Sequence, residues 1–393
     1  MSRVMLVFGT RPEAIKMAPV VRALAESPDH DPVVVVTAQH REMLDQVLDL
    51  FGITPDHDLD VSAPRQGLGP LTSRTLDRLG PVVEAERPDA VVVQGDTTTT
   101  LVGAMAGFYS RVPVVHMEAG LRTGDVGNPF PEEMNRRLVT RLASLHLAAT
   151  PAARDNLLSE GVSPADVHVT GNTVIDALLW AVDQDRPVED PLLARAENHD
   201  GPVLLWTSHR RESWGEPMTR VGRAVAEIAA AEPGLLVVLP AHRNPLVREA
   251  LAPTVAGIPN VLVGEPADYW SFARLMRRAH LLLTDSGGVQ EEGPSLGKPV
   301  LVTRATTERP EAVDAGVVEL VGTDPEVIVR RALELVRDDH EHARMAAAVS
   351  PYGDGRAGER TVQAVRRLLV GGPVDEFVPT LVRPRDAVPV PAA

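Results

Sequence analysis

The sequence contains no cysteine among its 393 residues. This absence excludes disulfide bonds, thiolate nucleophiles and zinc sites built on cysteine. Any catalysis would therefore use carboxylates, His, Lys, Arg or hydroxyl groups.

The chain also lacks a surplus of positive charge, and its formal net charge is −15. Binding to a nucleic-acid backbone needs clustered Lys and Arg that displace counterions, so we expect no nucleic-acid partner. An anionic small molecule is compatible with this charge, because a local group of Arg and His in a cleft can hold a diphosphate.

Long apolar segments are absent as well. No run of about 18 apolar residues could span a membrane. The first 14 residues form a short apolar strand that enters a Gly and Pro turn, without the apolar core of a signal peptide. We therefore expect a cytoplasmic protein that does not associate with membranes.

Hydrophobic residues make up 44% of the chain and charged residues 24%, which is ordinary for a globular protein. The chain is too long for a single hydrophobic core, so we expect two domains with a cleft between them.

The first half alternates short β-branched runs with amphipathic segments. Apolar runs without in-and-out alternation, separated by helical patterns such as 14–26 and 42–51, indicate a parallel sheet covered on both faces. We predict a doubly wound α/β domain. Its predicted strands are 4–8, 33–37, 90–93, 112–116 and 146–149.

A Pro-rich and acidic segment separates this half from a second α/β series, with further helices at 325–337 and 359–369. The strands predicted in the second series are 203–207, 235–239, 261–263, 281–284, 300–302 and 317–320. We predict an N-terminal Rossmann-like domain at 1–183, a linker at 184–201, a C-terminal Rossmann-like domain at 202–358, a helix at 359–370 that packs back on the first domain, and an extended or disordered Pro-rich tail at 371–393.

Ligands of such sheets bind outside the carboxyl ends of the strands. After the first strand, Gly9 permits a tight turn, Pro12 fixes the backbone, and Arg11 and Lys16 lie near a helix N-terminus, which attracts anions. This arrangement is typical of a phosphate site. The alternative is a helix start with solvated charges.

Carboxylates follow two later strands. Asp96 ends one strand, His116 and Glu118 lie at the end of the next, and Glu132 lies in the loop beyond. Clustered carboxylates raise one another's pKa, which suits general acid and base catalysis. Asp96 could instead simply cap the following helix, next to Thr97.

The second half carries candidate anion ligands. His209 and Arg210 follow a predicted strand, and His242 follows another. In the segment DSGGVQEEGPSLGKPV, Ser286 and two glycines let backbone amides approach a ligand at a helix start. Glu292, one turn later, could accept hydrogen bonds from ribose hydroxyls.

Taken together, these motifs resemble the bacterial non-hydrolysing UDP-N-acetylglucosamine 2-epimerases over about nine-tenths of the chain. The matching segments occur in order: GTRPEAIKMAP, TAQHREMLDQVL, GDTTTT, HMEAGLRTGD, PEEMNRR, GNTVIDAL, HRRES, DSGGVQEE, PSLGKPV, TTERPEA and PYGDG.

The resemblance implies a GT-B-type architecture and reversible conversion of UDP-N-acetylglucosamine to UDP-N-acetylmannosamine, without a cofactor or a metal. It implies anti elimination of UDP to 2-acetamidoglucal and re-addition of UDP, with the product used for cell-surface polysaccharide. Asp96, Glu118 and Glu132 become the acid and base set, with His209 also in the catalytic group, and the C2 base stays open among the carboxylates.

The resemblance also implies binding roles and an assembly. The UDP and sugar ligands would be Arg11, Lys16, His209, Phe272, Ser286, Gly287, Gly288, Glu292 and Arg309. A second UDP-N-acetylglucosamine would bind as an allosteric activator at Gln39, Arg65, Gln66, Glu132, Arg210 and His242. The family's usual assembly is a homodimer.

Three positions depart from the family pattern: Ser208 and Gln94 replace the common Gly and His, and Ala305 replaces an Asp. A shifted loop or a changed sugar preference would follow from Ser208. A hydrolysing epimerase, a GT-B glycosyltransferase and a non-catalytic UDP-sugar sensor are the competing interpretations.

Overall fold

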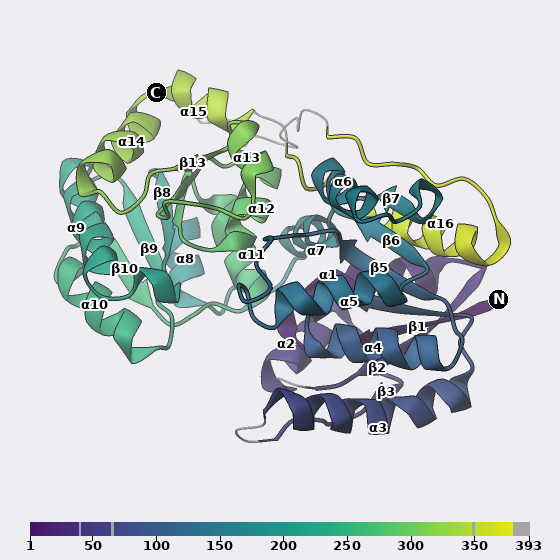
Figure 1. The fold of residues 1–393 in the computed structure, drawn as a ribbon. Helices are drawn as coiled ribbons and strands as arrows, with labels where there is room; N and C mark the ends of the chain where they lie inside the picture. Colours follow the sequence, from purple (N-terminus) through teal and green to yellow (C-terminus); the bar gives the residue numbers. More distant parts are fainter. Residues whose placement is uncertain (39–40, 64–66, 348–349, 380–393) are drawn as a thin grey trace. The chain divides into compact units, whose positions relative to one another are not determined.

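The computed structural model describes residues 1–38, 41–63, 67–347 and 350–379 (Figure 1). The chain divides into two compact units. The first comprises Met1–Ala177 with Tyr352–Val378, and the second comprises Leu178–Pro351.

The first unit contains a seven-stranded parallel sheet in the order β3-β2-β1-β4-β5-β6-β7. Its strands are β1 (Ser2–Phe8), β2 (His30–Val36), β3 (His57–Asp58), β4 (Ala90–Gln94), β5 (Val114–Ala119), β6 (Leu145–Ala148) and β7 (Val167–Val169). Its helices are α1 (Arg11–Glu26), α2 (Arg41–Phe51), α3 (Leu68–Glu86), α4 (Thr98–Tyr109), α5 (Glu132–Leu142), α6 (Pro151–Ser159) and α16 (Ala357–Val370), and α7 (Thr173–Val182) begins in this unit.

Helices on this sheet form two groups. The helix α1 packs against α2 and α16, whereas α4 packs against α3 and α5. The central strands are buried along their length, as expected for a sheet covered on both faces. Gly103 and Gly107 let α4 approach the sheet, because a Cβ atom at either position would lie 2.8 Å from a valine methyl group.

The second unit contains a six-stranded parallel sheet in the order β10-β9-β8-β11-β12-β13. Its strands are β8 (Val203–Thr207), β9 (Leu236–Pro240), β10 (Val261–Gly264), β11 (Leu281–Thr284), β12 (Val300–Val302) and β13 (Val318–Leu320). Its helices are α8 (Pro191–Glu197), α9 (Glu216–Ala231), α10 (Pro245–Val255), α11 (Tyr269–Arg278), α12 (Gly287–Ser295), α13 (Pro310–Asp314), α14 (Pro325–Arg337) and α15 (Asp339–Ala346).

One core of this unit lies between the sheet and a layer in which α9 packs against α10 and α14. Trp206 in β8 is fully buried there. On α11, Arg274 reaches α8 and donates to Glu197 at 2.5 Å. The fold is therefore α/β with two Rossmann-like units of GT-B type, as the sequence predicts.

The boundaries of the compact units differ from the predicted domain ranges. The predicted linker contains α8, whose residues Leu192 and Leu193 are buried and whose start is capped by Asp190. Residues 352–378 return to the first unit, where the Asn172 amide donates to the Tyr352 carbonyl at 2.6 Å and the Phe377 amide donates to the Val169 carbonyl at 2.7 Å. Of the Pro-rich tail, residues 380–393 lie outside the described residues.

Candidate active site

At the carboxyl edge of the first sheet, three loops meet because β1, β4 and β5 are neighbours. These loops carry most of the polar residues predicted for the first half. The region is built within one unit, so its geometry follows from the sheet itself.

Glu118 lies in a β-bulge, where the register between β5 and β6 shifts, and its backbone has φ of 56°. A bulge with a left-handed residue redirects the side chain. Lys16 donates to the Glu118 carboxylate at 2.5 Å and Asn172 donates at 3.0 Å. Gln94 donates to its second oxygen. The carboxylate is thus held by three donors, and Lys16 is committed to an ion pair in the same loop cluster.

Asp96 lies beside this group and is not the helix cap, because Thr97 is the N-cap of α4 and its hydroxyl accepts from the Thr100 amide. The cap interpretation of Asp96 is therefore wrong. Arg136 from α5 donates to the Asp96 carboxylate at 2.5 Å, and Asn135 donates to its backbone carbonyl at 2.9 Å. Burial raises the pKa of Asp96, and the nearby Glu118 adds to this, against the opposing charge of Arg136.

The side chains of two further predicted residues of this unit make no hydrogen bond or ion pair with any residue that the structure describes. Glu132 is the first residue of α5 and is half-buried. Arg11 is the first residue of α1 and is exposed. Both side chains stand at helix N-termini, and Arg11 is accessible to an anion there.

A buried carboxylate that our sequence analysis did not single out connects the loops. Glu13 is 1% exposed. It accepts the backbone amides of Gly9 and Thr10 at 3.0 and 2.8 Å, and the hydroxyls of Thr97 and Thr100 at 2.6 and 3.2 Å. Burial raises its pKa despite these bonds. The capping-box spacing from Thr10 to Glu13 was the sequence signal that could have identified it.

His116 does not lie at the exposed rim where we place it from the sequence. The strand continues to Ala119, and His116 is fully buried within it, with Nε2 2.7 Å from the Gly95 carbonyl. Burial lowers its pKa to about 3, so the ring is neutral at physiological pH. It supports the Gly95 turn.

In the second unit, β8 and β11 are neighbours and their following loops meet at the carboxyl edge. Ser286 is the N-cap residue of α12, and Gly287 begins the helix. A Cβ atom on Gly287 would lie 2.7 Å from Arg309 Nη1 and 3.1 Å from Arg210 Nη2. Two guanidinium groups thus lie over a helix N-terminus, which is a favourable place for a phosphate.

Acidic residues partly neutralise this cationic group. Arg309 pairs with Glu291 at 2.5 Å and with Glu308 at 2.7 Å, and Arg210 also reaches Glu308, at 3.1 Å. Partial burial acts to raise the pKa of Glu308, but Arg309 and Arg304 outweigh it and the pKa falls to about 2. Glu308 therefore stays charged and fixes the arginines.

The remaining predicted nucleotide ligands lie on α11 and α12. Glu292 is buried in α12 and accepts from the Tyr269 hydroxyl at 3.3 Å. Phe272 lies one turn into α11 and is half-buried. Gly288 is the second residue of α12 and is half-buried.

The three positions that depart from the family pattern lie in different surroundings. Gln94 donates to Glu118, as described above. Ser208 is buried and donates to Asp285 at 3.1 Å. Ala305 is exposed. Asp285 is fully buried and is a second residue that our sequence analysis left without a role. The sequence signal that could have identified Asp285 was a charged residue directly after an apolar strand.

The predicted activator residues are only partly described. Gln39, Arg65 and Gln66 lie outside the described residues. His242 is exposed and its ring stacks on that of His209, with the centroids 5.9 Å apart.

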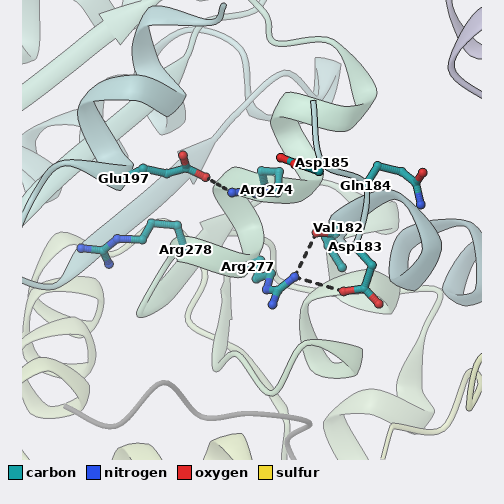
Figure 2. A pocket seen from close by; sticks show the side chains of 8 residues that line it. All are labelled: Val182, Asp183, Gln184, Asp185, Glu197, Arg274, Arg277 and Arg278. Atoms are coloured by element: carbon teal, nitrogen blue, oxygen red, sulfur yellow. Dashed lines mark hydrogen bonds and ion pairs between the residues drawn. The ribbon is translucent and has the colours of Figure 1, made fainter. Parts of the chain in front are cut away.

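Figure 2 shows a separate pocket of about 440 Å³ in the second unit. Its lining residues are Val182, Asp183, Gln184, Asp185, Glu197, Arg274, Arg277 and Arg278. None of these is a predicted site residue. Arg274 pairs with Glu197 at 2.5 Å and Arg277 with Asp183 at 3.2 Å, so these charges tie α11 to its neighbours. The predicted site residues lie at the carboxyl edges of the sheets and not in this pocket.

The described part of the chain holds neither a metal-binding cluster nor a helix that could cross a membrane. Across residues 1–38, 41–63, 67–347 and 350–379, no group of three or more His, Asp or Glu side chains is arranged to hold a metal ion. Within the same ranges, no helix has the length and apolar character needed to cross a membrane.

A two-unit GT-B-type fold with carboxylates at one sheet edge and a cationic helix N-terminus at another defines a class of α/β enzymes. The chain belongs to the UDP-N-acetylglucosamine 2-epimerase family, whose model matches residues 22–366. It is 51% identical over 369 residues to a UDP-N-acetylglucosamine 2-epimerase of Escherichia coli strain K12, covering 93% of this chain and 98% of that one.

Solved structures agree with this family. A UDP-N-acetylglucosamine 2-epimerase structure superposes with a TM-score of 0.88 at 45% identity, covering 96% of this chain and 100% of the other. The enzyme from Neisseria meningitidis, solved with UDP-N-acetylglucosamine bound, superposes with a TM-score of 0.83 at 44% identity, covering 93% and 100%.

Proposed function

We propose that this enzyme interconverts UDP-N-acetylglucosamine and UDP-N-acetylmannosamine by inverting C2, without releasing free sugar. Family membership supports the substrate, as does the relative solved with UDP-N-acetylglucosamine bound. The observation that carries the proposal is the carboxylate pair at the first sheet edge, where Asp96 has a raised pKa beside the firmly held Glu118.

The proposed reaction is an anti elimination followed by re-addition. A carboxylate removes the C2 proton, the electrons of the C2–H bond form the C1–C2 double bond, and the C1–O bond breaks so that UDP departs with that electron pair. The intermediate is 2-acetamidoglucal. UDP then adds back to C1 while a proton reaches the opposite face of C2. Asp96, Glu118 and Glu132 are the candidates for these proton transfers.

Their surroundings suggest different tasks. Glu118 is paired with Lys16 and held by Asn172, so it is kept as an oriented carboxylate. The raised pKa of Asp96 lets it hold a proton at higher pH than an exposed aspartate, which suits donation to C2. The assignment of the C2 base among the three stays a prediction.

In the proposal, UDP is bound mainly by the second unit. Ser286, Gly287 and Gly288 present the start of α12 to the diphosphate, with Arg309 above it. His209 joins this set, and Arg11 and Lys16 of the first unit complete the predicted ligands. Glu292 would take the ribose and Phe272 would lie near the uracil. Stabilising the departing UDP is the main task of these groups, because the C2 proton is weakly acidic.

Product analysis separates this proposal from its competitors. Incubation with UDP-N-acetylglucosamine, followed by phosphorus and proton NMR, should give UDP-N-acetylmannosamine and no accumulating free sugar. Free N-acetylmannosamine and UDP in equal amounts would indicate the hydrolysing reaction. Consumption only in the presence of an acceptor would indicate a glycosyltransferase, and binding without turnover would indicate a sensor.

Regulation by a second UDP-N-acetylglucosamine is also part of the proposal. The pairing of Arg210 with Glu308 and the stacking of His242 on His209 put two of the predicted activator residues beside the proposed diphosphate site. Conversion of UDP-N-acetylmannosamine alone should show a lag that a trace of UDP-N-acetylglucosamine abolishes. A rate independent of that trace would contradict it.

We further propose a homodimer formed through the α4 and α5 face. Phe108, Tyr109, Met134 and Leu138 are exposed there. Clustered exposed apolar side chains favour protein association. Supply of amino sugar for cell-surface polysaccharide and a cytoplasmic location stay predictions.

A further inference from the structure

Asp285 follows β11 and its side chain is fully buried at the carboxyl edge of the second sheet. Fully buried aspartates are rare unless they are paired. All of the described hydrogen-bond partners of its carboxylate come from the loop after β8, the next strand in the sheet. Asp285 therefore links two loops of the proposed diphosphate site.

Backbone groups make up most of this link. The His209 amide donates to the two carboxylate oxygens at 3.1 and 2.8 Å, and the Arg210 amide donates at 3.0 Å. The Ser208 hydroxyl donates at 3.1 Å to the same oxygen that Arg210 reaches. Backbone amides can only donate, so this loop conformation requires a buried acceptor at position 285.

The imidazole of His209 also contacts Asp285, with Nδ1 3.2 Å from the carboxylate. A carboxylate accepts hydrogen bonds and repels a nitrogen lone pair, so this close approach favours a hydrogen on Nδ1. In histidine, the hydrogen bond made by one ring nitrogen determines the role of the other. The contact with Asp285 therefore assigns the interaction with a ligand to Nε2.

We propose that Asp285 is a positioning residue for the diphosphate: it holds the Ser208–Arg210 loop and keeps a hydrogen on Nδ1 of His209, so that the ring, when protonated on both nitrogens, donates from Nε2–H to a phosphate oxygen. The ligand half of this inference rests on the proposed function, whereas the ring state does not. In this account Asp285 never touches the substrate, and its effect on UDP acts through His209.

The ring state can be measured in the full chain without a ligand. Long-range proton–nitrogen NMR on protein with labelled histidine would report the tautomer, and the signal lost in His209→Asn identifies the residue. The proposal expects a hydrogen on Nδ1 in the wild type, with both nitrogens protonated once UDP is bound, and a ring that has lost the Nδ1 hydrogen, in the neutral Nε2–H form, in Asp285→Asn. A wild-type ring in the Nε2–H form would overturn the proposal, even if the variant failed to fold.

Calorimetric binding of UDP tests the ligand half. Asp285→Asn should bind about 10- to 100-fold more weakly, since it disturbs a hydrogen bond to a charged group. Ser208→Ala should lose less than about threefold, because the two backbone amides still hold the loop.

The double variant Asp285→Asn with His209→Asn should bind no more weakly than His209→Asn alone, because both changes act on one group. Additive losses would instead mean a general structural role and would overturn the proposal. A wild type that does not bind UDP would contradict both the proposed function and the ligand half of this inference, while the NMR result would still decide the ring state.

Discussion

Glu118 shows at the scale of one residue how the local backbone prepares chemistry. Non-glycine residues with positive φ cost roughly 1–3 kcal/mol and persist where the surroundings determine them. Here the bulge in β5, the Lys16 ion pair and two amide donors fix the carboxylate at the sheet edge. The strained backbone and the ion pair indicate that Glu118 serves to place its carboxylate and does not serve to fill the core.

Replacing Glu118 by Gln should therefore abolish most activity with little change in fold. The amide removes the negative charge that faces Lys16 and cannot transfer the proton, so we expect kcat to fall by about 10²- to 10⁴-fold. Steady-state rates with UDP-N-acetylglucosamine measure this, with circular dichroism as the control for folding. A variant within tenfold of the wild type would remove Glu118 from the catalytic set.

Asp176 predicts a pH dependence of stability. Burial raises its pKa from 3.8 to about 7, although the Gly358 amide donates to Oδ1 at 2.7 Å. Its Oδ2 is buried and has no hydrogen-bond partner among the residues that the structure describes. The folded state thus keeps a proton that the unfolded state loses above about pH 4, so the free energy of unfolding falls as pH rises from about 4 to 7 and is then level.

The loss amounts to on the order of 4 kcal/mol at most. Asp176→Asn, which stays neutral, should be more stable than the wild type at pH 8 and should lack this slope. Thermal melting of both proteins from pH 4 to 8 measures it. Parallel curves for the two proteins would show that Asp176 is ionised in the fold.

At the scale of elements, the sequence predicts continuous apolar strands and amphipathic helices well. The strands at 203–207, 281–284 and 300–302 and the helix at 325–337 have the predicted bounds. The strands β3 and β7 were missed, because β3 consists of the polar pair His57–Asp58 and His168 interrupts the apolar run of β7.

For the candidate site, the sequence predicted which loops carry the polar residues but not how their side chains pair. Motifs identified loops at strand ends, and neighbouring strands bring those loops together. The sequence could not show that Lys16 pairs with Glu118 or that Arg136 pairs with Asp96, because the partners lie 102 and 40 residues apart. Nor could it place His116 inside the sheet, since β5 continues to Ala119, beyond the predicted strand end at residue 116.

The helix α4 supplies a prediction about packing. Gly103→Ala would bring a Cβ to 2.8 Å from a Val93 methyl in the buried sheet, so we expect a loss of about 1–3 kcal/mol from overpacking. Urea unfolding measures the change. Gly234→Ala is the control, since nothing lies within 4 Å of its Cβ position, and it should alter stability only slightly. Equal effects of both changes would contradict the close approach of α4.

For the whole molecule, assembly is the first testable property. The proposed dimer predicts a solution mass twice the 42.2 kDa of one chain. Replacing Phe108 and Tyr109 together by Ser should give the monomer mass, whereas Leu246→Ser, an exposed change on the second unit, should not. Light scattering after size exclusion measures all three. A monomeric wild type would contradict the dimer.

The proposed mechanism depends on proton exchange at C2 of the sugar. The most direct measurement is incubation with UDP-N-acetylglucosamine in deuterium oxide, with C2 followed by NMR. We expect deuterium at C2 of the UDP-N-acetylmannosamine formed and, as the reaction reverses, of the remaining UDP-N-acetylglucosamine. Epimer formation that retains the original hydrogen at C2, or a substrate that stays unchanged, would contradict it.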